Sequence, residues 1–160
     1  MNVRHISSLA NCLEASGELH VIAIYHPNWG TFYPLTLFLM PVSAGFPSPA
    51  EDYIEGKLDL NQYLVQHPAA TFFVRVSGDS MTGAGVHSGD LLIVDRAIEP
   101  TDGSIVIAVV NGELTVKRLH KQGDHLWLRA ENEHYQPLEI NESTEFQIWG
   151  VVTSAIHLLR

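Results

Sequence analysis

The sequence predicts a mainly β protein in which an N-terminal arm precedes a folded body. From Thr71 onward, short segments rich in β-branched and aromatic residues alternate with turn signals, a pattern typical of consecutive strands. The expected strands are Phe72–Val76, Leu91–Asp95, Ser104–Val110, Glu113–Leu119, His125–Arg129 and Phe146–Ile156. Asn111-Gly112 is the strongest hairpin signal in the chain, because this dipeptide favours the tight turn that joins two antiparallel strands.

Prolines mark the boundary between the arm and the body. Pro47 and Pro49 each push the residue before them towards extended backbone geometry, so no helix is expected to cross this stretch. We therefore expect residues 1–44 to form the arm and residues 45–160 to form one compact body.

One short helix is expected near the start of the body. Leu58–Gln66 contains apolar residues at helical spacing, Asp59 is suited to act as the N-cap, and Pro68 follows the end. This helix is interpreted as structural.

The arm contains two short apolar segments, Leu19–Tyr25 and Tyr33–Val42. Neither reaches the ~20 apolar residues that a membrane-spanning helix needs. The second segment ends in Val42-Ser43-Ala44, which imitates a secretory cleavage site, but a net negative segment precedes it and prolines interrupt it. We expect both segments to be β-strands or extended segments that pack on the body.

Composition excludes several classes of function. The chain is 46% hydrophobic and 17% charged, which is typical of a globular protein. Its net charge of −9 opposes binding to nucleic acid phosphates, so no direct DNA binding is expected. A single cysteine, Cys12, cannot form an internal disulfide, which makes the cytoplasm the expected compartment.

The turn that carries Ser80 is the first candidate functional feature. Ser77-Gly78-Asp79-Ser80-Met81 directly follows an expected strand, and Gly78 can adopt a positive φ without steric cost. Such a turn can present Ser80 and leave successive backbone N–H groups free to form an oxyanion hole. The same pattern also fits a serine that merely caps a turn.

Lys117 is the second candidate, because it lies inside an apolar strand pattern. Burial would lower its pKa and leave a neutral amine able to take the proton of Ser80. Thr115 lies two residues away on the same strand face, so its hydroxyl could orient the lysine. The alternative is a lysine that extends to a solvated edge.

A serine activated by a desolvated lysine can cut peptide bonds without histidine or metal. The candidate substrate is in the same chain, because Val42-Ser43-Ala44-Gly45 joins the arm to the body and its small residues would fit a tight site. A competing Ser-His-Asp arrangement would use His87, Asp90 and Asp95, which have no motif context. The nine histidines show no metal-ligand spacing, so no metal or other cofactor is expected.

The motifs together resemble the LexA/UmuD family of self-cleaving Ser-Lys proteins, and within it the UmuD/MucA-type SOS mutagenesis proteins. The resemblance covers residues 44–157. It rests on four segments in the family's order: Ala44-Gly45-Phe46-Pro47-Ser48-Pro49, Ser77-Gly78-Asp79-Ser80-Met81, Gly89–Asp95 and Glu113–Leu119. Residues 1–43 match the family poorly and form a longer arm than its UmuD branch has.

The resemblance implies roles for individual residues. Ser80 would be the nucleophile, Lys117 the general base, and the backbone amides of Asp79 and Ser80 the oxyanion hole. Ala44-Gly45 would be the scissile bond. The implied fold is a twisted, mostly antiparallel β body with a signal-peptidase-like core.

The resemblance also implies partners. These are a second copy of the chain in a homodimer, the RecA filament on single-stranded DNA as the trigger of cleavage, and a UmuC-type error-prone DNA polymerase that the cut form assists in translesion synthesis. Two alternatives stay open: a non-cleaving regulatory binding module of the same fold, and a LexA-like repressor fragment. The repressor is disfavoured, because residues 1–43 contain proline-broken aromatic segments rather than a basic helix-turn-helix.

Overall fold

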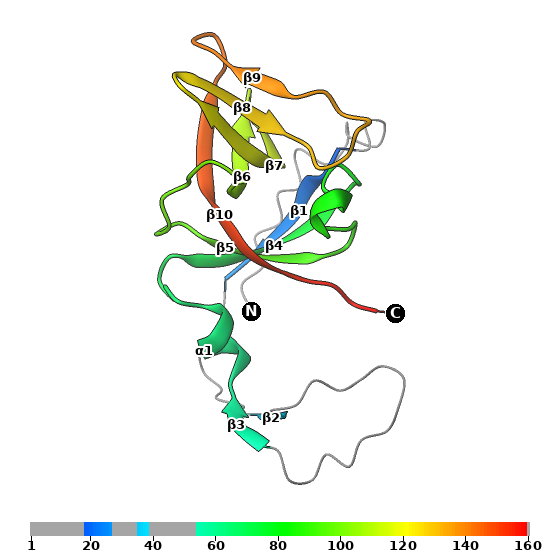
Figure 1. Ribbon diagram of the computed structural model, residues 1–160, viewed down its shortest axis with the longest axis vertical. Helices are drawn as coiled ribbons and strands as arrows, with labels where there is room; N and C mark the ends of the chain where they lie inside the picture. The colour runs from blue at the N-terminus through cyan, green and yellow to red at the C-terminus, as the bar shows by residue number, and fades with distance from the viewer. Residues whose placement is uncertain (1–17, 27–34, 39–53, 160) are drawn as a thin grey trace. The chain divides into compact units, whose positions relative to one another are not determined.

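The computed structural model describes residues 18–26, 35–38 and 54–159 (Figure 1). These residues belong to two compact units. One unit contains residues 18–26 and 67–159, and the other contains residues 35–38 and 54–66. The expected cleavage segment around Ala44 and Gly45 lies outside the described residues, so the proposed boundary between arm and body stays a prediction.

The larger unit is built almost entirely of strands. Its elements are β1 (His20–Tyr25), β4 (Thr71–Ser77), the short 3₁₀ helix η1 (Thr82–Ala84), β5 (Leu91–Asp95), β6 (Ile105–Val110), β7 (Glu113–Gln122), β8 (His125–Arg129), β9 (Leu138–Ile140) and β10 (Phe146–Ile156). All strand pairs are antiparallel. The mainly antiparallel β fold that the sequence predicts is therefore confirmed.

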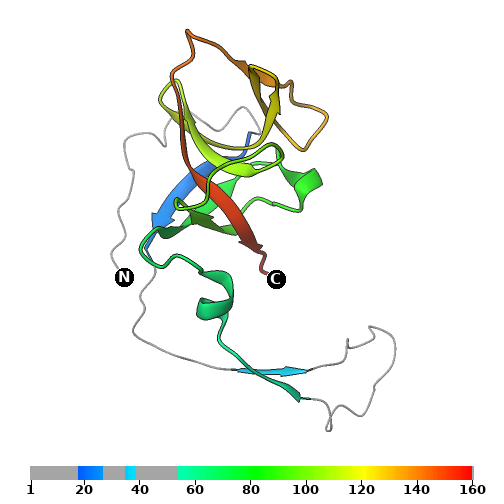
Figure 2. The ribbon, with the colours of Figure 1, turned by 60° about the vertical axis from the view of Figure 1, so that its left-hand side comes forward.

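The sheet has the strand order β1-β4-β5-β10-β6-β7-β8-β9. β1 also pairs with β7, where His20 lies opposite Thr115, and this contact closes a ring of strands. Figures 1 and 2 show β1, in blue, running alongside β4. β1 therefore fills the space between β4 and β7, the two strands that the sequence associates with Ser80 and Lys117.

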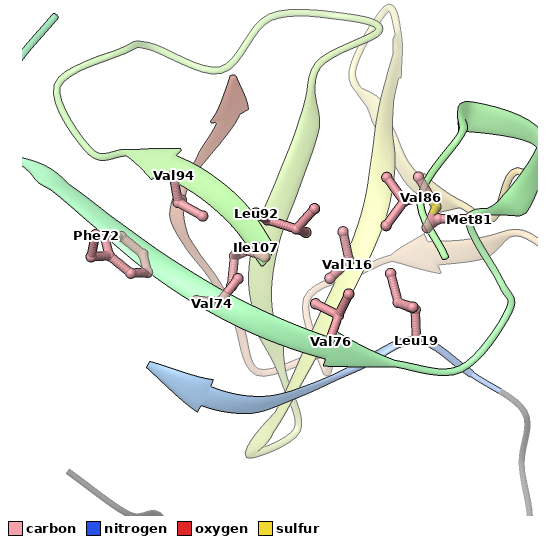
Figure 3. Close-up of a cluster of buried hydrophobic side chains, with 10 residues drawn as sticks. All are labelled: Leu19, Phe72, Val74, Val76, Met81, Val86, Leu92, Val94, Ile107 and Val116. Atoms are coloured by element: carbon pink, nitrogen blue, oxygen red, sulfur yellow. The ribbon is translucent and has the colours of Figure 1, made fainter. Parts of the chain in front are cut away.

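The main core lies inside this ring. Its buried residues come from the start of the segment that leads into β1, from β4, β5, β6 and β7, and from the turn after β4: Leu19, Phe72, Val74, Val76, Met81, Val86, Leu92, Val94, Ile107 and Val116 (Figure 3). A second cluster joins β6, β7, β8 and β10, and contains Val106, Ala108, Val110, Leu119, Leu128 and Val151. Both clusters use the alternate side chains of twisted strands.

The Asn111-Gly112 hairpin forms as predicted. Both residues have positive φ, 49° and 84°, which the tight hairpin turn requires, and Val110 pairs with Glu113 across it. The hairpin joins β6 to β7 and thereby sets the register that places Lys117 opposite Val106.

The smaller unit contains the two-stranded sheet of β2 (Leu35–Phe38) and β3 (Ile54–Leu58), followed by α1 (Leu60–Leu64). The Asp59 side chain accepts hydrogen bonds from the amides of Asn61 at 2.7 Å and Gln62 at 3.4 Å, so the predicted N-cap is confirmed. Among the described residues, no helix has the length and apolar character needed to cross a membrane.

Of the strands β1, β2, β3 and β9, two were expected from the sequence and two were not. β1 and β2 lie in the two apolar segments of the arm, where strands or extended packing were expected, and β1 is an integral part of the large sheet. β3 and β9 were not predicted. β3 contains Gly56 and two charged residues, and β9 has only three residues, so neither shows a strand pattern in the sequence.

Candidate active site

Ser80 is presented by a sharp turn at the end of β4. Gly78 follows the strand with φ of 112°, a conformation that residues with a side chain rarely adopt. The chain then turns through Asp79 into Ser80, which is completely buried. The turn thus carries the serine inward, against the strand that holds the candidate base.

Lys117 reaches Ser80 from β7. Its Nζ donates a hydrogen bond to Ser80 Oγ at 3.1 Å, and its side chain is nearly as buried as the serine. The alternative of a lysine at a solvated edge therefore does not apply. The structure thus brings the two candidate residues together, Ser80 from the turn after β4 and Lys117 from β7.

Two opposing influences act on the Lys117 amine. Burial lowers its pKa, because the charged ammonium form loses hydration. The Glu18 carboxylate, whose Oε1 lies 3.9 Å from Nζ, acts in the opposite direction and favours the charged form. Burial dominates, so the pKa of Lys117 lies below that of a solvated lysine.

A loop after β8 holds the serine turn in place. Glu131 N–H donates to the Ser80 carbonyl at 2.8 Å, and the Asn132 side chain donates to the Asp79 carbonyl at 3.1 Å. Tyr135 donates its hydroxyl to Asp79 Oδ1 at 2.5 Å, and this hydrogen bond raises the pKa of Tyr135 to about 12. Sequence reasoning missed these three residues, because no local motif signals a contact more than fifty positions away.

The carbonyls and amides of the serine turn have different partners. The carbonyls of Asp79 and Ser80 accept hydrogen bonds from the loop just described. Within the described part of the chain, their amides donate to no other group. The oxyanion hole that the resemblance implies at these two amides stays a prediction.

Thr115 does not make the expected contact with the lysine. Its hydroxyl is buried and has no hydrogen-bond partner among the described residues, while Lys117 Nζ is directed to Ser80. The orienting role assigned to Thr115 is therefore wrong for this conformation. In the strand register, Thr115 lies opposite His20 of β1.

The competing histidine arrangement is not formed at Ser80. Asp95 pairs with His67 at 2.6 Å, and Asp90 pairs with His157 at 2.6 Å. His87 lies 3.9 Å from Asp90 and thus belongs to the same cluster. Among the described residues, Ser80 Oγ accepts hydrogen bonds from Lys117 Nζ and the Leu19 amide and from no histidine.

In the part of the chain that the structure describes, one group of side chains could hold a metal ion. The ligand atoms of His87, Asp90 and His157 all lie within 4.8 Å of one another, although His157 is far from the other two residues in the sequence. Both carboxylate oxygens of Asp90 are already engaged, by His157 Nδ1 and by the His87 amide at 2.8 Å. A metal would have to replace the first of these hydrogen bonds.

Taken together, the fold and the site define a mainly β protein with a buried serine-lysine pair. The family model described as Peptidase S24-like matches residues 37–153, so the chain belongs to that family. This match covers every strand from β3 to β9 and most of β10.

Named relatives resemble the chain over most of its length. Protein SamA of Salmonella typhimurium strain LT2 is 52% identical over 124 residues, which cover 78% of this chain and 86% of SamA. Protein ImpA of Escherichia coli is 46% identical over 149 residues, which cover 86% of this chain and 96% of ImpA. Protein MucA of Escherichia coli is 42% identical over 125 residues, which cover 78% of this chain and 85% of MucA. The resemblance to the UmuD/MucA-type proteins is thereby confirmed.

Proposed function

We propose that the protein is an autoproteolytic serine endopeptidase that cuts its own chain between Ala44 and Gly45, with Ser80 as nucleophile and Lys117 as general base. The observation that carries this proposal is the 3.1 Å contact between Lys117 Nζ and Ser80 Oγ in a buried environment. A nucleophile within hydrogen-bond reach of its base is the first requirement of this chemistry. Family membership supports it independently.

The chemistry needs only groups of the chain and water. A neutral Lys117 amine takes the Ser80 hydroxyl proton as Oγ attacks the Ala44 carbonyl carbon. The amides of Asp79 and Ser80 stabilise the oxyanion, and Lys117 returns the proton to the departing Gly45 nitrogen. Water, activated by the same amine, then hydrolyses the acyl-serine ester and restores Ser80. No cofactor is required.

The cleaved product is proposed to act in the cytoplasm, as the homodimeric accessory subunit of a UmuC-type error-prone polymerase in the SOS response to DNA damage. The RecA filament on single-stranded DNA is proposed as the trigger. UmuD/MucA-type relatives support this role, and the net charge of −9 argues that the protein itself does not bind DNA. Two alternatives remain: a non-cleaving regulatory module, in which the pair is idle, and the less favoured LexA-like repressor fragment.

The roles of the two residues are tested by substitution. Ser80→Ala should abolish cleavage at every pH, because no nucleophile remains. Lys117→Arg should also abolish it, because a guanidinium stays charged and cannot accept the proton. Lys121→Arg is the matched control, since Lys121 lies farther along β7 and is exposed.

Mass spectrometry of the full chain after incubation at pH 10 gives the readout, and circular dichroism checks that each variant keeps its β structure. Normal cleavage by Lys117→Arg would exclude Lys117 as the base. Failure of the unsubstituted chain to cut at all would favour the non-cleaving module.

A further inference from the structure

The Ser80 site is occupied by the protein's own chain. The Leu19 amide donates a hydrogen bond to Ser80 Oγ at 3.0 Å, and this contact is buried. Directly before it, the Glu18 carbonyl oxygen passes so close to Gly78 that a methyl group there would lie 2.0 Å from it. The segment therefore lies directly on the serine turn, and only a glycine at position 78 permits this approach.

The segment is also held as a strand. β1 runs antiparallel to β4, from His20 opposite Ser77 to Tyr25 opposite Phe73. At its start, His20 also pairs with Thr115 of β7, so the segment bridges the strand that leads to Ser80 and the strand that carries Lys117. An extended substrate must enter between these same two strands to bring a peptide bond to both residues.

A single apolar anchor fixes the start of this strand. Leu19 is completely buried in the main core, and Figure 3 shows its side chain beside Val76 and directed toward Val116. Ile22, three residues along the same strand, is half exposed. The buried Leu19, the partly buried Val21 and Ile24, and the pairing with β4 therefore hold the segment in place.

The contact at Ser80 is not a reactive one. The Leu19 N–H directs its hydrogen at Oγ, which places Oγ near the plane of the Glu18–Leu19 peptide on its amide side. Attack requires Oγ to approach a carbonyl carbon from above that plane. Two donors, Leu19 N–H and Lys117 Nζ, also occupy the lone pairs that Oγ would use in attack.

The docked segment also acts on the base. Lys117 Nζ faces Glu18 at 3.9 Å, while the Tyr135 ring lies 5.9 Å away and its hydroxyl is bound to Asp79. The other titratable residues of the segment are His20 and Tyr25, at the two ends of β1. Among these groups, the Glu18 carboxylate is the one that raises the pKa of Lys117 and so favours its protonated, non-basic form.

We propose that residues 18–25 are a built-in competitor of the scissile segment, which occupies the substrate groove between β4 and β7 and keeps Ser80 and Lys117 unreactive until it is displaced. This inference rests on the proposed function, because the displaced competitor makes room for Ala44-Gly45. It assigns regulation of cleavage to a segment of the arm that does not contain the scissile bond.

Leu19→Asp in the full chain tests the competitor directly. Loss of the buried anchor should raise the rate of self-cleavage at pH 7 by about tenfold or more, because the rate follows the population with an open groove. Ile22→Asp is the matched control, since it makes the same change at an exposed position of the same strand, and its rate should equal that of the unsubstituted chain. If the unsubstituted chain cleaves itself and Leu19→Asp does so at the same rate, the inference is overturned and the proposed function stays intact.

Glu18→Gln gives a second test that does not disturb the core. Removal of the carboxylate should move the pH of half-maximal cleavage to a lower value, because the protonated form of Lys117 loses its partner. Glu113→Gln, an exposed change at the start of β7, serves as control. An unchanged profile for Glu18→Gln would contradict the docked arrangement, even if Leu19→Asp failed to fold.

Hydrogen exchange separates failure of this inference from failure of the proposed function. In a Gly45→Glu chain, whose scissile bond is blocked, the amides of residues 18–25 should exchange slowly, and Leu19→Asp should speed their exchange. Exchange at the rate of an unstructured peptide would overturn the inference. If no chain cleaves even at pH 10, the proposed function fails, and the exchange result alone decides whether residues 18–25 occupy the groove.

Discussion

Lys117 carries a cost that its chemistry requires. The amine is buried near the Glu18 carboxylate, and burial lowers its pKa below the 10.5 of a solvated lysine. Each pKa unit by which burial lowers this value costs the folded protein about 1.4 kcal/mol of stability at neutral pH. A lysine that served only to fill the core would be replaced to advantage by an apolar side chain.

Lys117→Met should therefore stabilise the protein at pH 7, by roughly 1 kcal/mol or more. Below the folded-state pKa, both folded and unfolded chains hold the proton and the buried charge exerts its full cost. As the pH rises through the folded-state pKa toward 10.5, the folded chain releases its proton first and the native lysine regains stability. The advantage of Lys117→Met should thus shrink as the pH rises.

Urea unfolding at pH 7 and pH 10 measures this difference. Both chains carry Gly45→Glu, so that cleavage does not interfere at the higher pH. Ser80 Oγ retains the Leu19 N–H as a partner after the substitution, which keeps the comparison free of an unpaired hydroxyl. A Lys117→Met advantage that grew with pH would contradict a lowered lysine pKa.

The sequence predicted the serine and the lysine but not their surroundings. Ser80 has a local signature, a glycine-containing turn after a strand, and Lys117 is a lone charge in an apolar strand. Tyr135 and Leu19 have none, because a tyrosine in a loop and a leucine in an apolar run are common everywhere. Thr115 was assigned its role from strand alternation alone, which fixes a shared face but not which atoms meet.

At the scale of elements, strands with clear patterns were predictable and strands defined by pairing were not. β5 and β8 lie where the residues indicate, and β6 and β7 are joined by the Asn111-Gly112 turn. β9 exists because it pairs with β8, and its three residues have no pattern of their own. β1 was expected to pack on the body, yet its place between β4 and β7 depends on tertiary pairing that no local pattern encodes.

Two glycine substitutions should separate the function of the serine turn from the stability of a hairpin. At Gly83, a new Cβ would lie 2.5 Å from the Glu131 carbonyl oxygen and would push apart the serine turn and the loop that holds it. At Gly112, the space is open but φ is 84°, so the cost is backbone strain of about 1 kcal/mol.

Gly83→Ala should consequently slow self-cleavage at pH 10 severalfold, because misplacement of a catalytic group by a fraction of an ångström is costly. Gly112→Ala should lower the midpoint of urea unfolding and leave the cleavage rate nearly unchanged. Rates come from mass spectrometry and midpoints from circular dichroism. Equal effects of the two substitutions on cleavage would contradict a specific coupling between the loop and the serine turn.

At the scale of the whole molecule, the sign of the charge limits what can trigger cleavage. With 18 acidic and 9 basic residues, the chain repels the phosphates of nucleic acid. DNA alone should therefore not accelerate cleavage, whereas RecA, nucleotide and single-stranded DNA together should do so near neutral pH. Omission of each component in turn, with Ser80→Ala as the blank, measures this. Equal rates without RecA would remove SOS control from the proposed function.

The central proposal is that Ser80 and the buried Lys117 cut the chain that contains them. The most direct test is intact mass measurement of the full chain incubated at pH 7 and at pH 10. We expect two fragments, residues 1–44 and 45–160, which form faster at pH 10 because a larger fraction of Lys117 is then neutral. An intact chain at pH 10, or a cut at another bond while Ser80 is present, would contradict it.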